Sequence, residues 1–439
     1  AARGAVKAML MAKVKVAAAI FCTAAVVAGG GTAAVRTLTA DRAPRTAPLV
    51  PDPEVMKIID SLGAGCSAWL PPVKTTGDLN ALTARYGMDE IGPDGRDYSI
   101  KMAWMPDRKR AVYYGTNYWY PHRLNDVWEY DLPSNTWVCL YGPDRSKKDG
   151  AADWDDVVLD GEVLRTKRGG PALLMNTQWQ LTYDRKRKAM LWLCGWRTPP
   201  KEFAGRWPAY SAEGRNTWPM WAFYPGEGRW EFLRPKAIEG AKTPPAGSLE
   251  YVDHLGTVVW TSEQGTWVLD GKSGAWRDLK PIGAEGKRIA PNDPEGQDQA
   301  AVCAYVAEKR ILISAGSAGK ANDKVSNNGR TNVYAFDTNT WTKVAEGPDV
   351  PAGCTHATSF AYDSVGKVCL LRGPLGGENR GAWAFDVETF KWRKLEPKGP
   401  PPPSEGDTIG YYDPERNVWV LKSGERTWVY RHARRAKRE

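Results

Sequence analysis

The sequence is poor in the residues on which most metal sites and nucleophilic catalytic sites depend. Its 439 residues include four histidines and seven cysteines, without a Cys-X-X-Cys pair or a Cys/His ligand spacing. A zinc site is therefore not supported, because zinc ligands come in such clusters. Nucleotide-binding loops and hydrolase triad signatures are also missing. We expect no cofactor and no metal ion, and binding is favoured over catalysis, although the sequence leaves an enzyme possible.

The central part of the chain also lacks a charge excess of either sign. The whole chain has a net charge of +9, but residues 1–45 carry seven Lys/Arg and one Asp, and residues 431–439 carry five Lys/Arg and one Glu. Residues 46–430 are left with a net charge of about −1. A nucleic-acid partner needs a basic face, so we expect none.

Long apolar runs are missing except near the N-terminus. Residues 16–27 form one such run, with Lys13 and Lys15 before it and small residues after it. This is the pattern of a secretory signal, and the run is close to the length that spans a bilayer. We expect residues 1–35 to be a signal peptide or an uncleaved membrane anchor, and the protein to be extracytoplasmic (periplasmic, secreted or on the cell surface).

Export would permit disulfide bonds. The sequence does not determine which cysteines would form disulfide bonds, but it divides six of them into two groups by the polarity of their neighbours. Three lie in apolar strand runs and are expected to pack as small hydrophobic residues: Cys194, Cys303 and Cys369. Three others are the less buried candidates for a disulfide: Cys66, Cys139 and Cys354.

What the chain has in abundance is a repeated aromatic pattern. Two apolar residues two positions apart, which share one side of a strand, are followed by a polar turn and usually by a tryptophan. The six pairs are Trp128/Tyr130, Trp221/Phe223, Trp267/Leu269, Tyr334/Phe336, Trp383/Phe385 and Trp428/Tyr430. A tryptophan follows four of them after seven residues (Trp137, Trp230, Trp276 and Trp392), and the Phe336 copy reaches Trp341 through a shorter turn.

A second repeated element lies upstream of each copy. It is a polar turn that leads into an apolar strand, and it begins at Asp107, Asp184, Asp253, Glu308, Asp363 and Asp413. With another strand before the turn, each unit has four strands. Four-stranded units repeated about every 50 residues predict an all-β fold, a six-bladed β-propeller. We interpret the repeated rings as packing between blades.

These units resemble the kelch repeat, in which a glycine-ended apolar strand precedes an aromatic residue and a tryptophan. The resemblance covers about residues 97–431. It implies a kelch-type propeller of the galactose-oxidase/kelch class, in an extracytoplasmic bacterial setting. One departure is clear, because the glycine doublet of the family is reduced to single glycines: Gly115, Gly195, Gly316, Gly373 and Gly424.

The last copy has no following tryptophan, whereas Trp69, far upstream, resembles one. We therefore expect residues 55–96 to form an extension with a strand that completes the last blade, which would remove an exposed edge. Residues 36–54 read as a proline-rich linker and residues 432–439 as a basic tail. Short helices are expected at residues 54–62 and 78–86, the second beginning at Asp78 and ending at Gly87.

The long insertions are predicted to gather on one face of the ring. With the strands of a blade labelled a to d from the axis outward, the a–b and c–d turns are short. Insertions fall between b and c (115–125, 195–217 and 315–330) and between d and the next a (142–170, 280–298 and 396–406). Binding sites usually lie where long loops decorate a rigid scaffold.

This face is rich in aromatic, guanidinium and amide groups, which suit the stacking faces and polar edges of sugars and also suit protein partners. We expect an exported propeller that binds a protein or glycan ligand there. The alternative is that the loops bury their own aromatics. The candidate binding residues are Tyr118, Trp119, Tyr120, His122, Arg123, Trp196, Arg197, Trp207, Arg330 and Arg380.

Two enzyme classes have related propellers. The galactose-oxidase-like copper radical enzymes need two histidines and a cysteine-linked tyrosine, but only His122 and His356 could meet and neither follows a tyrosine. We exclude that class. The sialic-acid mutarotases are also six-bladed, and a similar sugar-modifying site at the axial mouth would use Gln299, His356 and Asp407. His254 lies in a short turn on the opposite face.

Overall fold

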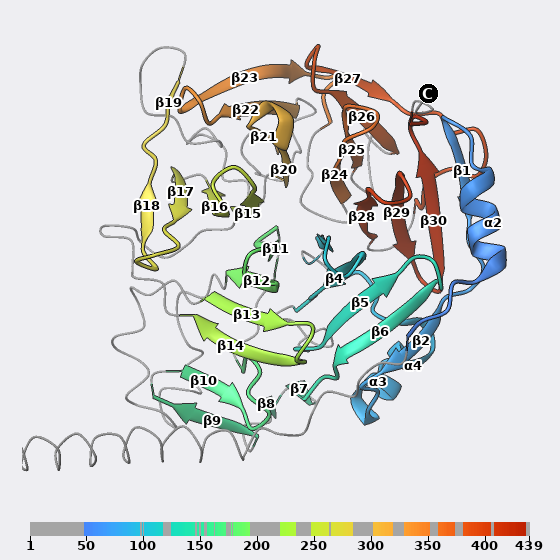
Figure 1. Ribbon diagram of the computed structural model, residues 1–439, viewed down its shortest axis with the longest axis vertical. Helices are drawn as coiled ribbons and strands as arrows, with labels where there is room; N and C mark the ends of the chain where they lie inside the picture. Colours follow the sequence, from blue (N-terminus) through green and yellow to red (C-terminus); the bar gives the residue numbers. More distant parts are fainter. Residues whose placement is uncertain are drawn as a thin grey trace, which may run out of the picture. The chain divides into compact units, whose positions relative to one another are not determined.

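The computed structural model describes residues 48–96, 99, 101–116, 124–144, 147–148, 151–152, 156–161, 163–172, 177, 179–193, 220–233, 247–262, 265–283, 302–318, 329–351, 359–373, 381–404 and 408–435. The chain divides into two units, Ala1–Arg45 and Thr46–Glu439. The described part of the second unit is mostly β-strand and forms a six-bladed β-propeller (Figure 1).

Within the described residues, each blade contains four antiparallel strands, which occupy positions a to d from the ring axis outward. The first three blades are β3 (Met102–Met105), β4 (Arg110–Tyr113), β5 (Val127–Asp131) and β6 (Thr136–Tyr141); β11 (Leu181–Asp184), β12 (Ala189–Leu193), β13 (Met220–Tyr224) and β14 (Arg229–Leu233); and β15 (Gly247–Val252), β16 (Thr257–Ser262), β17 (Gly265–Leu269) and β18 (Trp276–Asp278). The last three are β20 (Val302–Val306), β21 (Ile311–Ala318), β22 (Gly329–Ala335) and β23 (Thr340–Gly347), with the 3₁₀ turn η2 (Ala307–Lys309); β24 (Ser359–Asp363), β25 (Val368–Arg372), β26 (Ala382–Asp386) and β27 (Lys391–Lys394); and β28 (Ile409–Asp413), β29 (Val418–Ser423), β30 (Arg426–Arg431) and β1 (Cys66–Trp69). The inner strands β3, β11, β15, β20, β24 and β28 neighbour one another in this order, and β28 returns to β3, so the ring is closed.

The predicted closure of the last blade is confirmed. β1 pairs antiparallel with β30, so a strand from the N-terminal extension supplies position d. The register differs from the expectation, however, because Trp69 lies opposite Trp428 while Ser67 lies opposite Tyr430. Ser67 therefore occupies the position that the return-strand tryptophans hold in the other blades. The next segment, β2 (Lys74–Gly77), runs parallel to β6 as a fifth strand of the first blade, so the extension joins the two ends of the ring.

The N-terminal extension contains three short helices. α2 (Pro53–Ser61) begins where the Asp52 carboxylate accepts the amide hydrogens of Glu54 and Val55, as an N-cap does, and it confirms the helix expected at 54–62. The second prediction is only partly correct: α3 (Ala81–Arg85) is capped by Asn80, and α4 (Met88–Ile91) follows it. Asp78 instead accepts hydrogen bonds from the Gly142 amide at 2.7 Å and from Arg168 at 2.6 Å.

The turns repeat as closely as the strands do. In all six a–b turns the fourth residue is left-handed, with φ between 50° and 60°: Lys109, Lys188, Gly256, Arg310, Lys367 and Asn417. The five c–d turns within the described residues have the same feature at Asn135, Gly228, Gly274, Asn339 and Phe390. Four-residue hairpin loops built on a type I turn need such a residue before the return strand, which explains why both kinds of turn are short.

The outer pairs, each formed by a tryptophan and another apolar residue, flank the c–d turns, as the sequence pattern predicted. The cross-strand partners are Tyr130/Trp137, Phe223/Trp230, Leu269/Trp276, Tyr334/Trp341 and Phe385/Trp392. The fourth pair shows that the shorter turn expected after Phe336 is wrong, because Tyr334 and not Phe336 is the partner of Trp341. These rings also join blades: the Nε1 atoms of Trp341 and Trp392 donate to threonines of the preceding blade, Thr266 at 3.0 Å and Thr331 at 2.8 Å.

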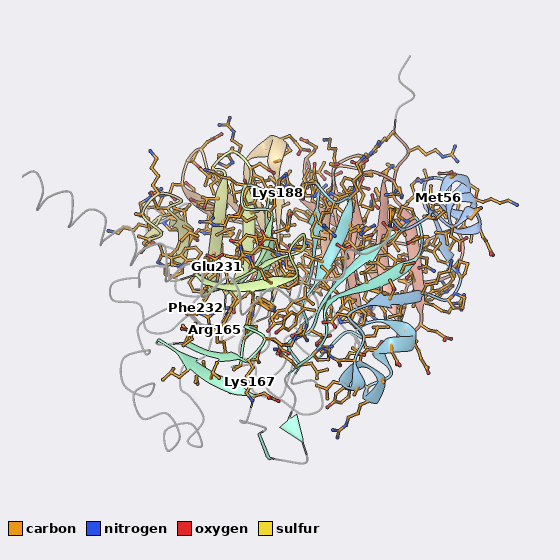
Figure 2. All side chains as sticks on the ribbon, turned by 60° about the horizontal axis from the view of Figure 1, so that its bottom comes forward. Met56, Arg165, Lys167, Lys188, Glu231 and Phe232 are labelled. Atoms are coloured by element: carbon orange, nitrogen blue, oxygen red, sulfur yellow. The ribbon has the colours of Figure 1, made fainter. Side chains whose placement is uncertain are left out.

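Several predicted loops contain regular structure. Residues 142–170 include the two-residue strands β7 (Lys147–Lys148) and β8 (Ala151–Ala152) and the hairpin of β9 (Val157–Asp160) and β10 (Val163–Thr166). Figure 2 shows Arg165 and Lys167 of this hairpin on one side of β14, which carries Glu231 and Phe232, and Lys188 of an a–b turn on the other. Residues 280–298 include β19 (Ile282–Gly283), which pairs parallel with β23. The strands β21 and β22 extend into the insertion expected at 315–330.

The cysteine expectations are partly confirmed. Cys303 and Cys369 are buried in the sheets, as predicted. Cys139 is also buried, at 1% exposure, so its placement among the less buried cysteines is wrong. No disulfide joins the four cysteines that the structure describes, Cys66, Cys139, Cys303 and Cys369; Cys194 and Cys354 lie outside the described residues. Among the helices described, none has the length and apolar character needed to cross a bilayer.

Candidate functional site: an axial pocket

The inner strands carry one aromatic residue each at the same register position. Each of these residues is the penultimate residue of strand a, two positions before the first residue of the a–b turn, and lies opposite the second residue of strand b. We call this set the aromatic collar: Trp104, Tyr183, Tyr251, Tyr305, Tyr362 and Tyr412. Because the turns have one common geometry, six blades bring six equivalent rings around one axis.

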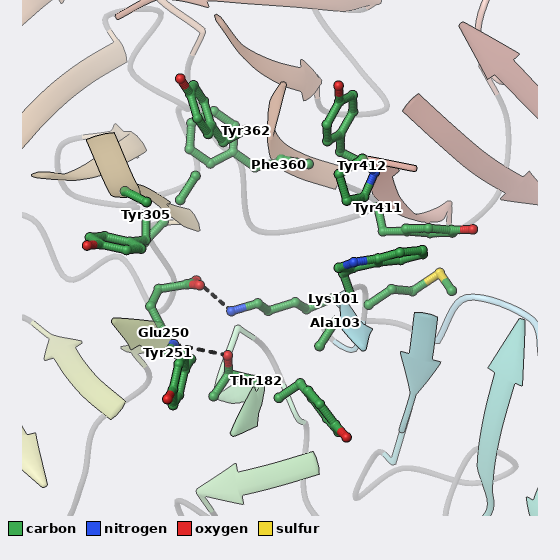
Figure 3. Close-up of a pocket in the computed structure, with 18 of the residues that line it drawn as sticks. Lys101, Ala103, Thr182, Glu250, Tyr251, Tyr305, Phe360, Tyr362, Tyr411 and Tyr412 are labelled. Carbon is green, nitrogen blue, oxygen red and sulfur yellow. Dashed lines mark hydrogen bonds and ion pairs between the residues drawn. The ribbon is translucent and has the colours of Figure 1, made fainter. Parts of the chain in front are cut away.

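The aromatic collar lines a cavity of about 310 Å³ at the ring axis (Figure 3). All six inner strands contribute to its wall. Its outer end reaches the a–b turns through Arg185, Asp253, Ala307, Glu308, Ser364 and Pro414. The pocket therefore opens on the face with the short turns.

Hydrogen bonds between blades position three members of the aromatic collar. The hydroxyl of Tyr183 donates to Asp107 of the first blade at 2.7 Å, and Tyr362 donates to Glu308 of the fourth blade. The hydroxyl of Tyr305 and Nδ1 of His254 are 2.7 Å apart. In each case the partner is the second residue of the preceding blade's a–b turn. These three tyrosines are therefore positioned by the neighbouring blade, which preorganises their part of the wall.

Burial also keeps these phenols protonated. Desolvation is the main cause that raises the pKa of Tyr183, Tyr251, Tyr305, Tyr362 and Tyr412. Neighbouring carboxylates add to this effect at Tyr183 and Tyr362. The collar thus presents neutral rings.

An ion pair crosses the interior of the pocket. Lys101, just before β3, places its Nζ 2.5 Å from Oε1 of Glu250 on β15 (Figure 3). Their side chains are 7% and 13% exposed, so both are almost fully buried. Nζ also donates to the Leu249 carbonyl at 2.7 Å. Oε1 of Glu250 further accepts from Trp179 Nε1 at 3.2 Å and from Ser248 Oγ at 3.3 Å.

Burial acts on both members of this pair in the sense that disfavours charge. Desolvation raises the pKa of Glu250 and lowers the pKa of Lys101, while their mutual attraction opposes both shifts. A pair of this kind persists because each charge satisfies the other in a low-dielectric site. Together with Thr182, Ser364 and the charged residues near the a–b turns, the pair makes the wall of the pocket polar as well as aromatic.

Most candidate residues predicted from the sequence lie outside the described residues. This applies to Tyr118, Trp119, Tyr120, His122, Arg123, Trp196, Arg197, Trp207 and Arg380, and to the axial-mouth set Gln299, His356 and Asp407. Arg330 is described, and the expectation that it lies in a loop is wrong. It lies in β22 opposite Glu346 of β23, with its Nε 2.6 Å from the carboxylate.

The axial pocket was not predicted from the sequence, because the long insertions, predicted on the other face, were interpreted as the binding site. The repeated aspartates at the a–b turns were recognised, but the aromatic residue before each of them was not. Three of the six collar positions read Tyr-Asp, at Tyr183, Tyr362 and Tyr412. That recurring dipeptide was a usable signal.

Fold and site together define a six-bladed β-propeller with an aromatic axial pocket. No protein-family model matches the chain, and no curated protein matches it in sequence. Among solved structures, it is similar to TolB from Acinetobacter baumannii (TM-score 0.37, 10% identity, 70% of this chain and 55% of that one). It is also similar to an oligogalacturonate lyase in complex with manganese (TM-score 0.38, 12% identity, 75% of each chain). The chain thus spans about 55% of the length of the TolB structure that it matches.

Proposed function

We propose that this protein is an exported, kelch-type propeller that binds a glycan, and that the axial pocket holds a short saccharide. The observation that supports this most directly is the aromatic collar, with six equivalent rings around a cavity of about 310 Å³. Pockets for small ligands commonly start near this volume. Export rests on the basic and apolar pattern of residues 1–35.

The chemistry of the wall suits a sugar. Saccharides present apolar C–H faces that pack on aromatic rings and hydroxyl edges that need hydrogen-bond partners. The collar offers the rings, and the interior offers the Lys101–Glu250 pair. Tyr251 and Tyr305 are both half-buried, so part of each ring is open to a ligand.

A binding assay with matched variants tests the proposal. The full chain and its Tyr251→Ala/Tyr305→Ala variant are titrated with a panel of mono- and disaccharides by calorimetry. We expect the affinity of the variant for the sugar to be at least about tenfold lower than that of the full chain, because each lost stacking contact contributes about 0.5–1.5 kcal/mol beyond its buried area. Tyr224→Ala is the control, because Tyr224 is also half-buried but stacks with Arg229 in the second blade, outside the pocket.

A second candidate places the ligand, a protein or a glycan, on the long-loop face. The residue composition supports it, with Tyr118, Trp119 and Tyr120 in one insertion and Trp196 and Trp207 in another. A Trp119→Ala/Trp207→Ala variant separates the two candidates. Loss of binding in this variant, with binding retained in Tyr251→Ala/Tyr305→Ala, would assign the ligand to the loops. Conversion of a sugar that stops in His356→Ala would support the sugar-modifying alternative.

A further inference from the structure

We infer that the Lys101–Glu250 pair makes the pocket selective for uncharged saccharides, because it offers both an acceptor and a donor to neighbouring hydroxyl groups of a sugar. This inference rests on the proposed function, since it concerns the ligand of the same pocket. It adds the chemical class of the ligand and names the polar residues that would select this class.

The carboxylate of Glu250 has one oxygen committed and one available. Oε1 accepts from Lys101, Trp179 and Ser248, which holds the carboxylate in place. Among the described residues, Oε2 has no hydrogen-bond partner, and Glu250 lines the cavity with 13% of its side chain exposed. A carboxylate oxygen can only accept a hydrogen bond, so Oε2 calls for a donor on the ligand.

The ammonium group of Lys101 has the complementary capacity. Two of its three hydrogens go to the Leu249 carbonyl and to Glu250 Oε1. The third has no hydrogen-bond acceptor among the described residues, although Nζ lies 5.4 Å from the centre of the Trp179 ring, and Lys101 also lines the cavity. It calls for an acceptor on the ligand. A hydroxyl group both donates and accepts, and neighbouring hydroxyls of a sugar ring can satisfy the carboxylate oxygen and the ammonium hydrogen together.

Charge balance argues against an ionic ligand. Every charged residue that lines the cavity already has an opposite partner. Lys101 pairs with Glu250 and Arg185 with Asp253, both at 2.5 Å, and Glu308 pairs with Lys367 at 2.6 Å. A carboxylate or ammonium group of a ligand would lose part of its hydration in the pocket without gaining a free counter-ion, which is costly. An uncharged, hydroxyl-bearing ligand avoids this cost.

The test compares ligands as well as variants. The full chain is titrated with neutral monosaccharides, with the matching uronic acids and with the matching 2-amino sugars. We expect the neutral sugars to bind at least about tenfold more tightly than either charged series. This comparison needs no variant, so it stands even if a substitution prevents folding.

The variant Lys101→Met/Glu250→Gln removes both charges together, which avoids leaving one of them buried without a partner. We expect its affinity for neutral sugars to fall at least about tenfold while its thermal unfolding remains cooperative. The control is Lys109→Met/Glu415→Gln, which removes an ion pair of 3.1 Å between two a–b turns outside the pocket lining. Its affinity should equal that of the unmodified chain.

Two results would overturn the inference: tighter binding of a charged sugar, or unchanged affinity in the folded double variant. In both cases the proposed function survives if Tyr251→Ala/Tyr305→Ala still weakens binding. If no sugar of any charge binds the unmodified chain, the proposed function fails as well.

Discussion

The propeller contains two sets of repeated aromatic residues that share a turn geometry but differ in surroundings. The inner set is the aromatic collar, which precedes the a–b turns and lines a cavity. The outer set flanks the c–d turns and packs between sheets, where Trp341 is 1% exposed and bonded to Thr266 of the preceding blade. Both kinds of turn place a left-handed residue at the same position.

The difference shows that repetition by itself does not identify function. Four of the five outer tryptophans are buried between the sheets and Trp392 is half-buried, so the fold itself accounts for these rings. The inner set lies at the axis, where six blades converge and cannot fill the space that they enclose. A repeated ring becomes available for a ligand only where the architecture leaves a cavity.

The largest effect is expected from an outer tryptophan. Trp341→Ala should lower the free energy of unfolding by about 3–5 kcal/mol, because it leaves a cavity and removes the hydrogen bond to Thr266. The inner counterpart in the same blade, Tyr305→Ala, should cost less than about 2 kcal/mol, because Tyr305 is only half-buried. Urea unfolding followed by tryptophan fluorescence measures both. Equal losses would show that the collar belongs to the core.

A smaller effect is expected from the left-handed residues of the two turns. Lys188, in an a–b turn (Figure 2), has φ 54° and an exposed side chain without a hydrogen-bond partner among the described residues. Lys188→Gly should raise stability by up to about 1 kcal/mol, because glycine adopts this conformation without steric cost.

Its counterpart in a c–d turn should respond in the opposite sense. Asn339 accepts a hydrogen bond from the Tyr334 hydroxyl and donates one to the Leu279 carbonyl, both at 2.7 Å. Asn339→Gly should therefore lower stability by about 1–2 kcal/mol, since both bonds are lost. Denaturation midpoints of the two variants give the signs directly. A change of the same sign in both would mean that backbone strain outweighs these side-chain bonds.

The sequence predicted the features that depend on local repetition. Blade number, the short turns and the tryptophan spacing follow from patterns within about 50 residues. The spare strand near Trp69 also predicted ring closure correctly. Its register was not predictable, because Ser67 gives no aromatic signal opposite Tyr430 and only the hydrogen-bond ladder decides the pairing.

Features that depend on contacts between distant segments were out of reach. β2 and β19 are short and lack alternating apolar residues, and they become strands only because β6 and β23 offer free edges. The axial pocket belongs to the same class. Its collar positions are visible in the sequence, but the cavity exists only once six inner strands converge.

The smallest expected effect is on the pH dependence of stability, which distinguishes a histidine beside the aromatic collar from a histidine beside the outer strands. His254, in an a–b turn, contacts the collar through Tyr305, while His432 follows β30 and lies 2.6 Å from the Arg393 guanidinium and 3.2 Å from the Tyr430 hydroxyl. Desolvation, with a nearby arginine as the next cause, lowers the pKa of both below the ordinary 6.5. Below about pH 6.5 the unfolded chain therefore binds more protons than the folded chain does. The contribution of these histidines to the free energy of unfolding is complete above about pH 6.5 and decreases as the pH falls below that value.

We expect the melting temperature to decrease when the pH is lowered from 7.5 to 5.5. His432→Gln should reduce this pH dependence more than His254→Gln does, because the His254 side chain is exposed and that of His432 is only half-exposed. A larger effect from His254→Gln would mean that the collar, rather than the outer strands, controls the acid sensitivity of the ring.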